Sequence, residues 1–242
     1  MNINVKIFRY NPEKQKAGQL IDYSVRFEPG MSVLALLHRV HDDQDGTLAY
    51  RYSCRGAICG TCAVKINGSA RLACKTQVSR LLEEGDTITI EPLTNLAVIK
   101  DLVVDQRPFW AMIKATMPWL VREKDMPDER MTYELSLNKT QLDQLNRASD
   151  CIKCASCYAD CPKVKQAPEF IGPATSIQIY KQLFDPRDTN TDARMAHSKA
   201  KNGVFDCDKH ANCVRVCPKD CRPLRAITFI QDRLKAQSLN RA

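Results

Sequence analysis

Residues 53–62 are SCRGAICGTC, with three cysteines spaced as C-x4-C-x2-C, and a fourth cysteine follows at position 74. The glycines and small residues in this loop let the backbone wrap closely around an inorganic cluster and point amide hydrogens at its sulfide atoms. This spacing is typical of a plant-type binuclear iron-sulfur site. It predicts a [2Fe-2S] cluster held by Cys54, Cys59, Cys62 and Cys74.

The segments on either side of this loop predict a small sheet. Residues 2–9 and 23–27 alternate apolar and polar side chains, as two paired strands do, and a polar turn lies between them. Ser32 precedes apolar residues with helical spacing, so a serine-capped helix should follow. Strand, strand, helix is the start of a β-grasp fold. Further strands are predicted at 63–66, 71–74 and 87–91, the first two joined by an Asn67-Gly68 turn.

The second cysteine run, residues 151–162, is CIKCASCYADCP. It matches the bacterial ferredoxin pattern, in which the first three cysteines hold one cluster and the fourth binds the neighbouring cluster. The third run, residues 207–218, is spaced C-x5-C-x3-C-P. We therefore expect a [4Fe-4S] cluster on Cys151, Cys154, Cys157 and Cys217, and another cluster on Cys161, Cys207 and Cys213.

The third run lacks one thiolate, because His210 stands where a full ferredoxin repeat has a cysteine. Two interpretations stay open. In one the site holds a trinuclear [3Fe-4S] centre, and in the other His210 ligates a fourth iron, since imidazole replaces thiolate in some clusters. Cys221 remains outside all three sets. It is interpreted as a small buried or half-buried thiol, with oxidation or contact with another subunit as alternatives.

A chain of 242 residues has room for two domains. The alternating pattern stops near Leu102, and prolines then separate segments with helical spacing, at 142–148, 174–183, 194–199 and 224–236. The prediction is an α+β protein with a β-grasp [2Fe-2S] ferredoxin-like domain over 1–104. A mainly helical, bacterial-ferredoxin-like domain with two clusters should occupy 105–242. Trp110 and Trp119 are expected to pack in the core or in the seam between the domains.

Charge and composition exclude several classes of function. The formal net charge is +8, but three clusters with their thiolates bring it to about +2, so nucleic acid is not an expected partner. Structural zinc sites usually pair two CxxC units, which these runs do not. The first residues, MNINVKIFRY, do not form a signal peptide, and the apolar runs are too short to span a membrane. The expected compartment is the reducing cytosol, without disulfides.

These motifs together resemble one family. RYSCRGAICGTCAVKING, LACKT, DLVVD, CIKCASCYADCP, PEFIGPA, NGVFDC and CVRVCPK follow one another over essentially the whole chain. The sequence is similar to the iron-sulfur subunit of succinate dehydrogenase and fumarate reductase. The resemblance implies a β-grasp domain with [2Fe-2S], followed by a helical domain with [4Fe-4S] and [3Fe-4S].

The resemblance also implies partners. A flavoprotein subunit would carry FAD and the dicarboxylate chemistry, in agreement with the lack of a G-x-G-x-x-G loop and of a catalytic triad in this chain. One or more membrane anchor subunits, which would carry any haem, would hold this subunit at the cytoplasmic face of the inner or plasma membrane. Electrons would pass singly between flavin and quinone through the binuclear, tetranuclear and trinuclear centres.

In the family, quinone approaches the segments that contain Pro162, Lys163, Gln166, Asp208 and His210 in this chain. Several relatives have tryptophan at the position of Gln166 and lysine at that of Gln231, so this chain departs from them there. His210 is a candidate proton carrier, or a hydrogen-bonded spacer. The alternatives are the iron-sulfur subunit of a related soluble, thiol-linked fumarate reductase, and a structural metal-binding adaptor.

Overall fold

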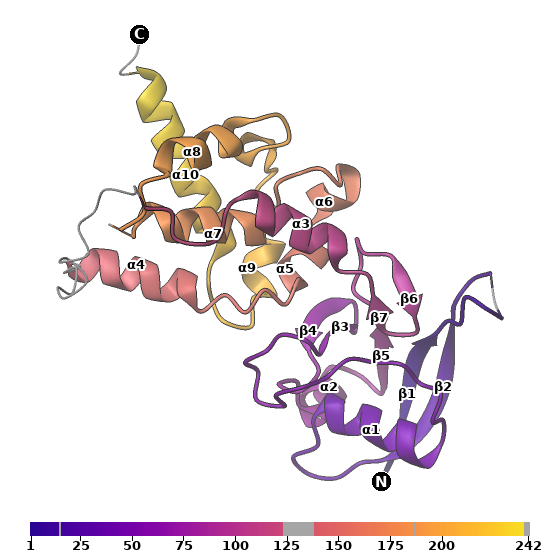
Figure 1. The fold of residues 1–242 in the computed structure, drawn as a ribbon. Helices are drawn as coiled ribbons and strands as arrows, with labels where there is room; N and C mark the ends of the chain where they lie inside the picture. The colour runs from indigo at the N-terminus through magenta and orange to yellow at the C-terminus, as the bar shows by residue number, and fades with distance from the viewer. Residues whose placement is uncertain (15, 123–137, 186, 240–242) are drawn as a thin grey trace. The chain divides into compact units, whose positions relative to one another are not determined.

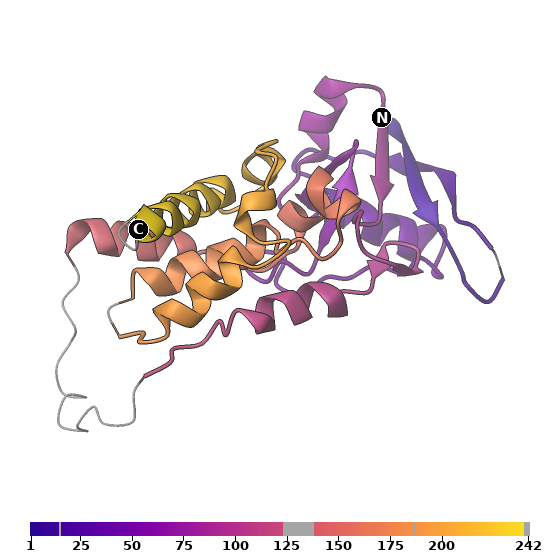
Figure 2. The same ribbon diagram turned by 90° about the horizontal axis from the view of Figure 1, so that it is seen from above.

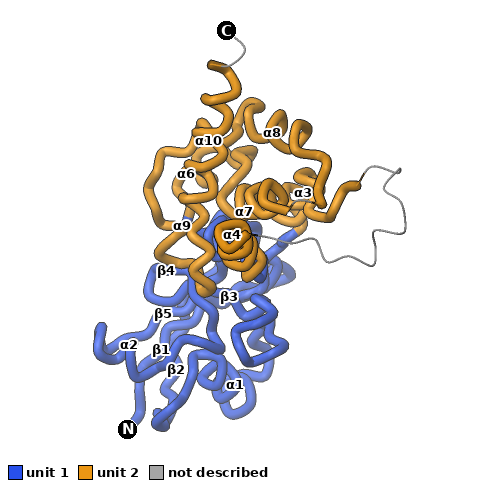
Figure 3. The backbone as a smooth tube through the Cα atoms, turned by 90° about the vertical axis from the view of Figure 1, so that its left-hand side faces the viewer, with its two compact units in different colours: residues 1–106, 152–160 blue, residues 107–151, 161–242 orange. Residues whose placement is uncertain are grey.

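The computed structural model describes residues 1–14, 16–122, 138–185 and 187–239. The chain forms two compact units (Figure 3), one of residues 1–106 with 152–160 and one of residues 107–151 with 161–242. Cysteine spacing did not predict that residues 152–160 return to the first unit. The domain boundary between residues 104 and 105 stays a prediction.

The first unit is a mixed sheet with short helices (Figure 1). Its strands and helices are β1 (Asn2–Arg9), β2 (Gln19–Arg26), α1 (Val33–Asp43), β3 (Ala63–Ile66), β4 (Ser69–Leu72), α2 (Val78–Glu84), β5 (Thr87–Glu91), β6 (Val98–Lys100), β7 (Val103–Val104) and α5 (Ser156–Ala159).

The main sheet has the strand order β2-β1-β5-β3-β4. β1 pairs antiparallel with β2 and parallel with β5, and β5 pairs antiparallel with β3. The alternation predicted for residues 2–9 is observed, since Val5 and Ile7 are fully buried. This β-grasp arrangement, followed by a helical unit, confirms the α+β fold class.

Helix α1 begins where the sequence predicts. The Ser32 side chain accepts a hydrogen bond from the Ala35 backbone N–H at 3.2 Å, which satisfies one of the free donors of the first turn. The apolar face of the helix is buried, with Leu36 and Leu37 at its centre. The cap and the buried face together fix this helix in the first unit.

Residues 152–160 are anchored to the first unit by hydrogen bonds. The Ala70 backbone N–H donates to the Asp160 carboxylate at 3.2 Å. Thr94 Oγ1 donates to the Ala159 carbonyl at 2.6 Å, and Asn95 Nδ2 donates to the same carbonyl at 2.9 Å. The segment that carries Cys154 and Cys157 is therefore part of the unit that contains the binuclear loop.

Three sequence expectations need correction here. The strand predicted at 71–74 is β4 (Ser69–Leu72), so Cys74 lies in the turn that follows and not on a strand. The helix α2 and the β6–β7 hairpin were not predicted, because each is too short to give a clear periodic pattern. Trp110 and Trp119 are 45% and 51% exposed, so they are not part of the core, and a place in the seam between the domains stays a prediction.

The second unit is helical, with α7 at its centre and α10 running beside it (Figures 1 and 2). Every residue of α7 from Pro173 to Tyr180 is buried. A helix that is buried on all sides is the core of its unit. The elements of this unit are α3 (Arg107–Ala115), α4 (Lys139–Ser149), α6 (Pro162–Gln166), α7 (Pro173–Leu183), α8 (Thr191–Lys199), η2 (Val204–Asp206), α9 (Asn212–Arg215) and α10 (Pro223–Leu239).

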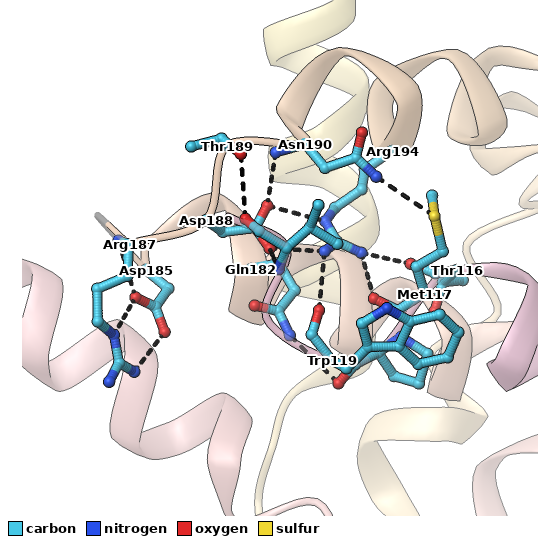
Figure 4. A network of polar contacts seen from close by, with 12 residues as sticks. Thr116, Met117, Trp119, Gln182, Asp185, Arg187, Asp188, Thr189, Asn190 and Arg194 are labelled. Atoms are coloured by element: carbon cyan, nitrogen blue, oxygen red, sulfur yellow. Dashed lines mark hydrogen bonds and ion pairs between the residues drawn. The ribbon is translucent and has the colours of Figure 1, made fainter. Parts of the chain in front are cut away.

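A buried arginine fixes the segment after α3 (Figure 4). Arg194 is fully buried, and its guanidinium donates to the backbone carbonyls of Thr116, Met117 and Trp119. The Asp188 carboxylate, also fully buried, balances its charge at 2.6 Å. This network ties residues 116–119 to α8.

No helix in the described ranges is both long and apolar enough to cross a lipid bilayer.

Candidate metal centres

The binuclear loop is shaped by residues in left-handed backbone conformations. Arg55 and Ala57 have φ values of 54° and 57°. This turns successive amides toward one sulfur atom, so that the backbone N–H groups of Gly56, Ile58 and Cys59 donate to Cys54 Sγ at 3.4, 3.3 and 3.3 Å. Amide donors to a thiolate sulfur are a standard feature of iron-sulfur sites.

These donors change the acidity of the ligands. The backbone N–H of Cys59, followed by those of Gly56 and Ile58, lowers the pKa of Cys54 to about 6. Burial raises the pKa of Cys62 to about 12. Cys62 also hydrogen-bonds with Cys74, so these two predicted ligands are in contact. The Cys54 thiol is therefore mostly deprotonated at neutral pH. The Cys62 thiol loses its proton at neutral pH only when a metal binds it.

Gly60 brings this loop against the second cysteine run. A Cβ on Gly60 would lie 2.8 Å from Cys154 Cβ and 3.0 Å from the Ile152 carbonyl oxygen, and Gly60 has a φ of 74°. Only glycine suits both the conformation and the close approach. The binuclear loop and the segment with Cys154 and Cys157 are in direct contact as a result.

The second and third cysteine runs share one local conformation. Lys153 and Ala155 have φ values of 52° and 65°, and Lys209 and Ala211 have φ values of 58° and 62°. A short helix follows each pair, α5 after the first and α9 after the second. The two loops therefore repeat each other in structure as well as in sequence.

In this repeat His210 occupies the position of Cys154. Its side chain is 48% exposed, and its Nε2 atom lies 3.9 Å from Asp208 Oδ2. Lys163 Nζ lies 3.7 Å from the same carboxylate oxygen. The imidazole thus lies near a carboxylate at the surface, and the trinuclear interpretation stays a prediction.

The predicted ligands of the third cluster lie together in the second unit. Cys161, Cys207 and Cys213 line one cavity and are close enough to interact electrostatically. Burial raises the pKa of Cys207, and it raises the pKa of Cys213 to about 12. Three thiols that line one cavity suit a cluster whose iron replaces their protons.

Two predicted ligands of the second cluster, Cys151 and Cys217, are in the second unit, and both hydrogen-bond with Cys221. The hydrogen bond from the Cys221 side chain lowers the pKa of Cys217 to about 6, and the Cys221 backbone N–H donates to Cys217 Sγ at 3.3 Å. The pKa of Cys221 is raised, mainly by its contact with Cys151 and then by that with Cys217. Cys154 and Cys157 belong to the first unit.

Four of the five predicted quinone contacts line the cavity of Cys161, Cys207 and Cys213: Pro162, Lys163, Asp208 and His210. Gln166 does not line this cavity and lies exposed at the end of α6. Gln231 is 4% exposed, and its Nε2 donates to the Val204 carbonyl at 2.6 Å, three residues before Cys207. Sequence reasoning gave Gln231 no such structural role, because the contact joins distant parts of the chain.

The donor chemistry of these sites fits iron-sulfur clusters. Each predicted set consists of thiols in loops whose backbone is in left-handed conformations, and in the first set three amide groups already point at a ligand sulfur. Among the described residues, no three His, Cys, Asp or Glu side chains converge on one point as a single metal ion requires. A cluster does not need such convergence, because its ligands bind different iron atoms.

Comparisons with known proteins agree with this chemistry. A family model described as a 2Fe-2S iron-sulfur cluster binding domain matches residues 4–111, and one described as a 4Fe-4S dicluster domain matches residues 144–218. The chain is 36% identical to the fumarate reductase iron-sulfur subunit of Haemophilus influenzae, over 93% of this chain and 90% of the relative. It is also 36% identical to the mitochondrial succinate dehydrogenase [ubiquinone] iron-sulfur subunit of Candida glabrata, over 95% and 90%.

A solved structure has the same fold. A chain of the Mycobacterium smegmatis Sdh1 complex in the apo form matches with a TM-score of 0.85 and 26% identity, over 98% of this chain and 96% of that chain.

The fold and the cysteine sets define an iron-sulfur electron-transfer protein with binuclear and tetranuclear cluster domains. The chain belongs to the family of iron-sulfur subunits of succinate dehydrogenase and fumarate reductase. It is the electron-transfer subunit of an oxidoreductase complex, as predicted. A [3Fe-4S] centre is consistent with the family.

Proposed function

We propose that this chain carries single electrons between the FAD of a flavoprotein subunit and a quinone at a membrane anchor subunit. The observation that carries the proposal is the order of the three cysteine sets. The first set is complete in the β-grasp unit, and its loop contacts the segment that holds Cys154 and Cys157. The last set lacks a thiolate and lines a cavity with polar, exposed groups at its rim.

The proposal assigns eleven cysteines as ligands. When bound, the clusters supply one-electron carriers. The contribution of the chain is to hold the thiolates, exclude water and donate amide hydrogens to sulfur, as at Cys54. The assignment is Cys54, Cys59, Cys62 and Cys74 for [2Fe-2S], Cys151, Cys154, Cys157 and Cys217 for [4Fe-4S], and Cys161, Cys207 and Cys213 for [3Fe-4S].

The quinone end is assigned to the rim formed by Pro162, Lys163, Asp208 and His210, with Gln166 on the adjoining helix. Reduction of a quinone to a quinol takes two electrons and two protons. The Lys163 ammonium group can donate a hydrogen bond to a quinone carbonyl oxygen, and the His210 imidazole can donate or accept one. The Asp208 carboxylate lies near both side chains, 3.7 Å from Lys163 Nζ and 3.9 Å from His210 Nε2.

The position in the cell follows from these partners. Because no described helix is suited to span a bilayer, the chain would be held peripherally, through the anchor subunit, at the cytoplasmic face of the membrane. The flavoprotein would carry the dicarboxylate chemistry, and the anchor would carry any haem.

The test compares two single variants of this chain, Lys163→Ala and His210→Ala, each in the assembled complex. We expect quinone-linked turnover to fall, while succinate-dependent reduction of a dye that accepts electrons from the flavin stays unchanged. EPR should still detect all three centres. Lys165→Ala is the matched control, because Lys165 is an exposed lysine of the same helix that does not line the cavity. Unchanged quinone turnover in both variants would remove this rim from the quinone site.

A further inference from the structure

Cys221 is the one cysteine that the three ligand sets leave out, and it does not lie on the surface. Its side chain is 5% exposed. It follows Cys217 by four residues and lies just before α10, between Asp220 and Arg222, which have φ values of 50° and 52°. The turn directs its thiol inward, toward two of the assigned ligands of the tetranuclear cluster.

The side chain of Cys221 contacts two ligand sulfurs and one backbone carbonyl. Its side chain hydrogen-bonds with those of Cys151 and Cys217, and its backbone N–H donates to Cys217 Sγ at 3.3 Å. Cys221 Sγ also donates to the Lys219 carbonyl oxygen at 3.9 Å. Residue 221 thus presents two donors, the amide and the thiol, to ligand sulfur.

We propose that the Cys221 thiol is a hydrogen-bond donor to the thiolates that hold the tetranuclear cluster, and that it raises the reduction potential of this centre. The inference rests on the assignment of Cys151 and Cys217 as ligands in the proposed function.

The physical reason is electrostatic. Hydrogen bonds to ligand sulfurs are among the factors that set cluster potentials. Reduction adds negative charge, part of which falls on the thiolates. A donated hydrogen stabilises the reduced state more than the oxidised one. A thiol that does not bind iron has an S–H group, which is a weak hydrogen-bond donor. Since the Cys221 side chain is almost closed to water, solvent competes little for its hydrogen bond.

A chain with a buried apolar residue at this position would fill the same space without the donor. Serine keeps a donor of similar size, whereas alanine keeps only the backbone N–H. Comparison of the two therefore separates hydrogen bonding from packing.

The test is an EPR-monitored redox titration of the assembled complex with wild-type chain, Cys221→Ala and Cys221→Ser. We expect Cys221→Ala to lower the midpoint potential of the tetranuclear centre and Cys221→Ser to restore it in whole or in part. The binuclear and trinuclear potentials, read in the same samples, should not move. Ser198→Ala is the matched control, because it also removes a buried donor, one bonded to the Arg194 carbonyl at 2.9 Å.

A tetranuclear potential in Cys221→Ala equal to that of the wild type would overturn the proposal, and so would equal shifts in the alanine and serine variants. Should Cys221→Ala not load its cluster, electron-nuclear double resonance of the reduced wild-type complex in H2O and D2O decides. An exchangeable proton coupled to the tetranuclear spin that is present in the wild type and in Cys221→Ser, but missing in Cys221→Val, supports the thiol donor, because the backbone N–H that donates to Cys217 Sγ is present in all three. The absence of such a coupled proton in the wild-type complex would refute the thiol donor. A wild-type complex without a tetranuclear signal would instead overturn the ligand assignment itself.

Discussion

Gly60 and Cys154 lie so close that a methyl group on Gly60 would be 2.8 Å from Cys154 Cβ. Gly60 stands between two assigned ligands of the binuclear cluster, and Cys154 is an assigned ligand of the tetranuclear cluster. The loop of the binuclear cluster and the segment that carries Cys154 therefore approach each other at a residue that has no side chain.

We predict that Gly60→Ala slows electron transfer from the binuclear to the tetranuclear centre, because tunnelling rates fall steeply with separation. The left-handed φ of Gly60 costs about 1–2 kcal/mol with a Cβ present, and overpacking adds about 1–3 kcal/mol. Rapid-freeze EPR and thermal unfolding of the complex measure the two effects. Gly30→Ala is the control, because Gly30 has a φ of 80° and no neighbour within 4 Å of its added Cβ. Equal electron-transfer rates in the two variants would contradict the role of the contact.

A second prediction concerns His210. If the third cluster is trinuclear, His210→Ala should leave the EPR signal of the oxidised trinuclear centre in place, because the imidazole engages Asp208 and is half exposed. His210→Cys should place a thiolate where the repeat has Cys154 and allow a fourth iron to bind. Iron analysis and EPR of both variants check this. Loss of the cluster in His210→Ala would show that His210 is a ligand.

The third prediction is a difference in thiol reactivity after removal of iron by a chelator. The backbone donors at Cys54 lower its pKa to about 6, so its alkylation by iodoacetamide should stay fast down to about pH 6 and slow below it, as the thiolate takes up a proton. Burial raises the pKa of Cys62 to about 12, so Cys62 should react slowly at neutral pH. Peptide mapping by mass spectrometry measures both. A Cys54 midpoint at the ordinary thiol value of about 8.5 would count against the loop geometry.

The fourth prediction concerns the buried pair of Arg194 and Asp188. Arg194→Met should reduce the free energy of unfolding by about 3–5 kcal/mol, because it leaves the Asp188 carboxylate buried without its partner. Arg39→Met is the control, since the Arg39–Glu28 pair is 36% and 50% exposed and should contribute about 1 kcal/mol or less. Thermal unfolding measures both. Similar losses in the two variants would mean that the buried network does not stabilise residues 116–119.

The sequence was informative where periodicity or ligand spacing is local. The strands at 2–9, 63–66 and 87–91, the capped helix after Ser32 and the four longer helices are found where the patterns predict them. The short elements α2, β6 and β7 were missed, and the pattern did not exclude the two tryptophans from the core, because an aromatic residue in a helical pattern does not reveal whether another element covers it.

For the cluster sites, too, the sequence predicts local relationships but not contacts between distant segments. The spacing predicts which cysteines belong together, but not that Cys221 hydrogen-bonds with Cys151, since no local pattern relates residues so far apart. Nor does the motif around Gly60 show that the chain returns to it at Cys154. Both relationships depend on packing between distant segments.

The return of residues 152–160 to the β-grasp unit has a consequence for folding and for the dissection of this protein. The amide of Ala70 and the side chains of Thr94 and Asn95 have their acceptors on that segment. A fragment that ends at residue 106 would lack these acceptors and would expose the surface that they cover. The first half of the chain is thus not a self-contained ferredoxin module that can be cut out or exchanged, and its final form is reached only after the ribosome has made residue 160.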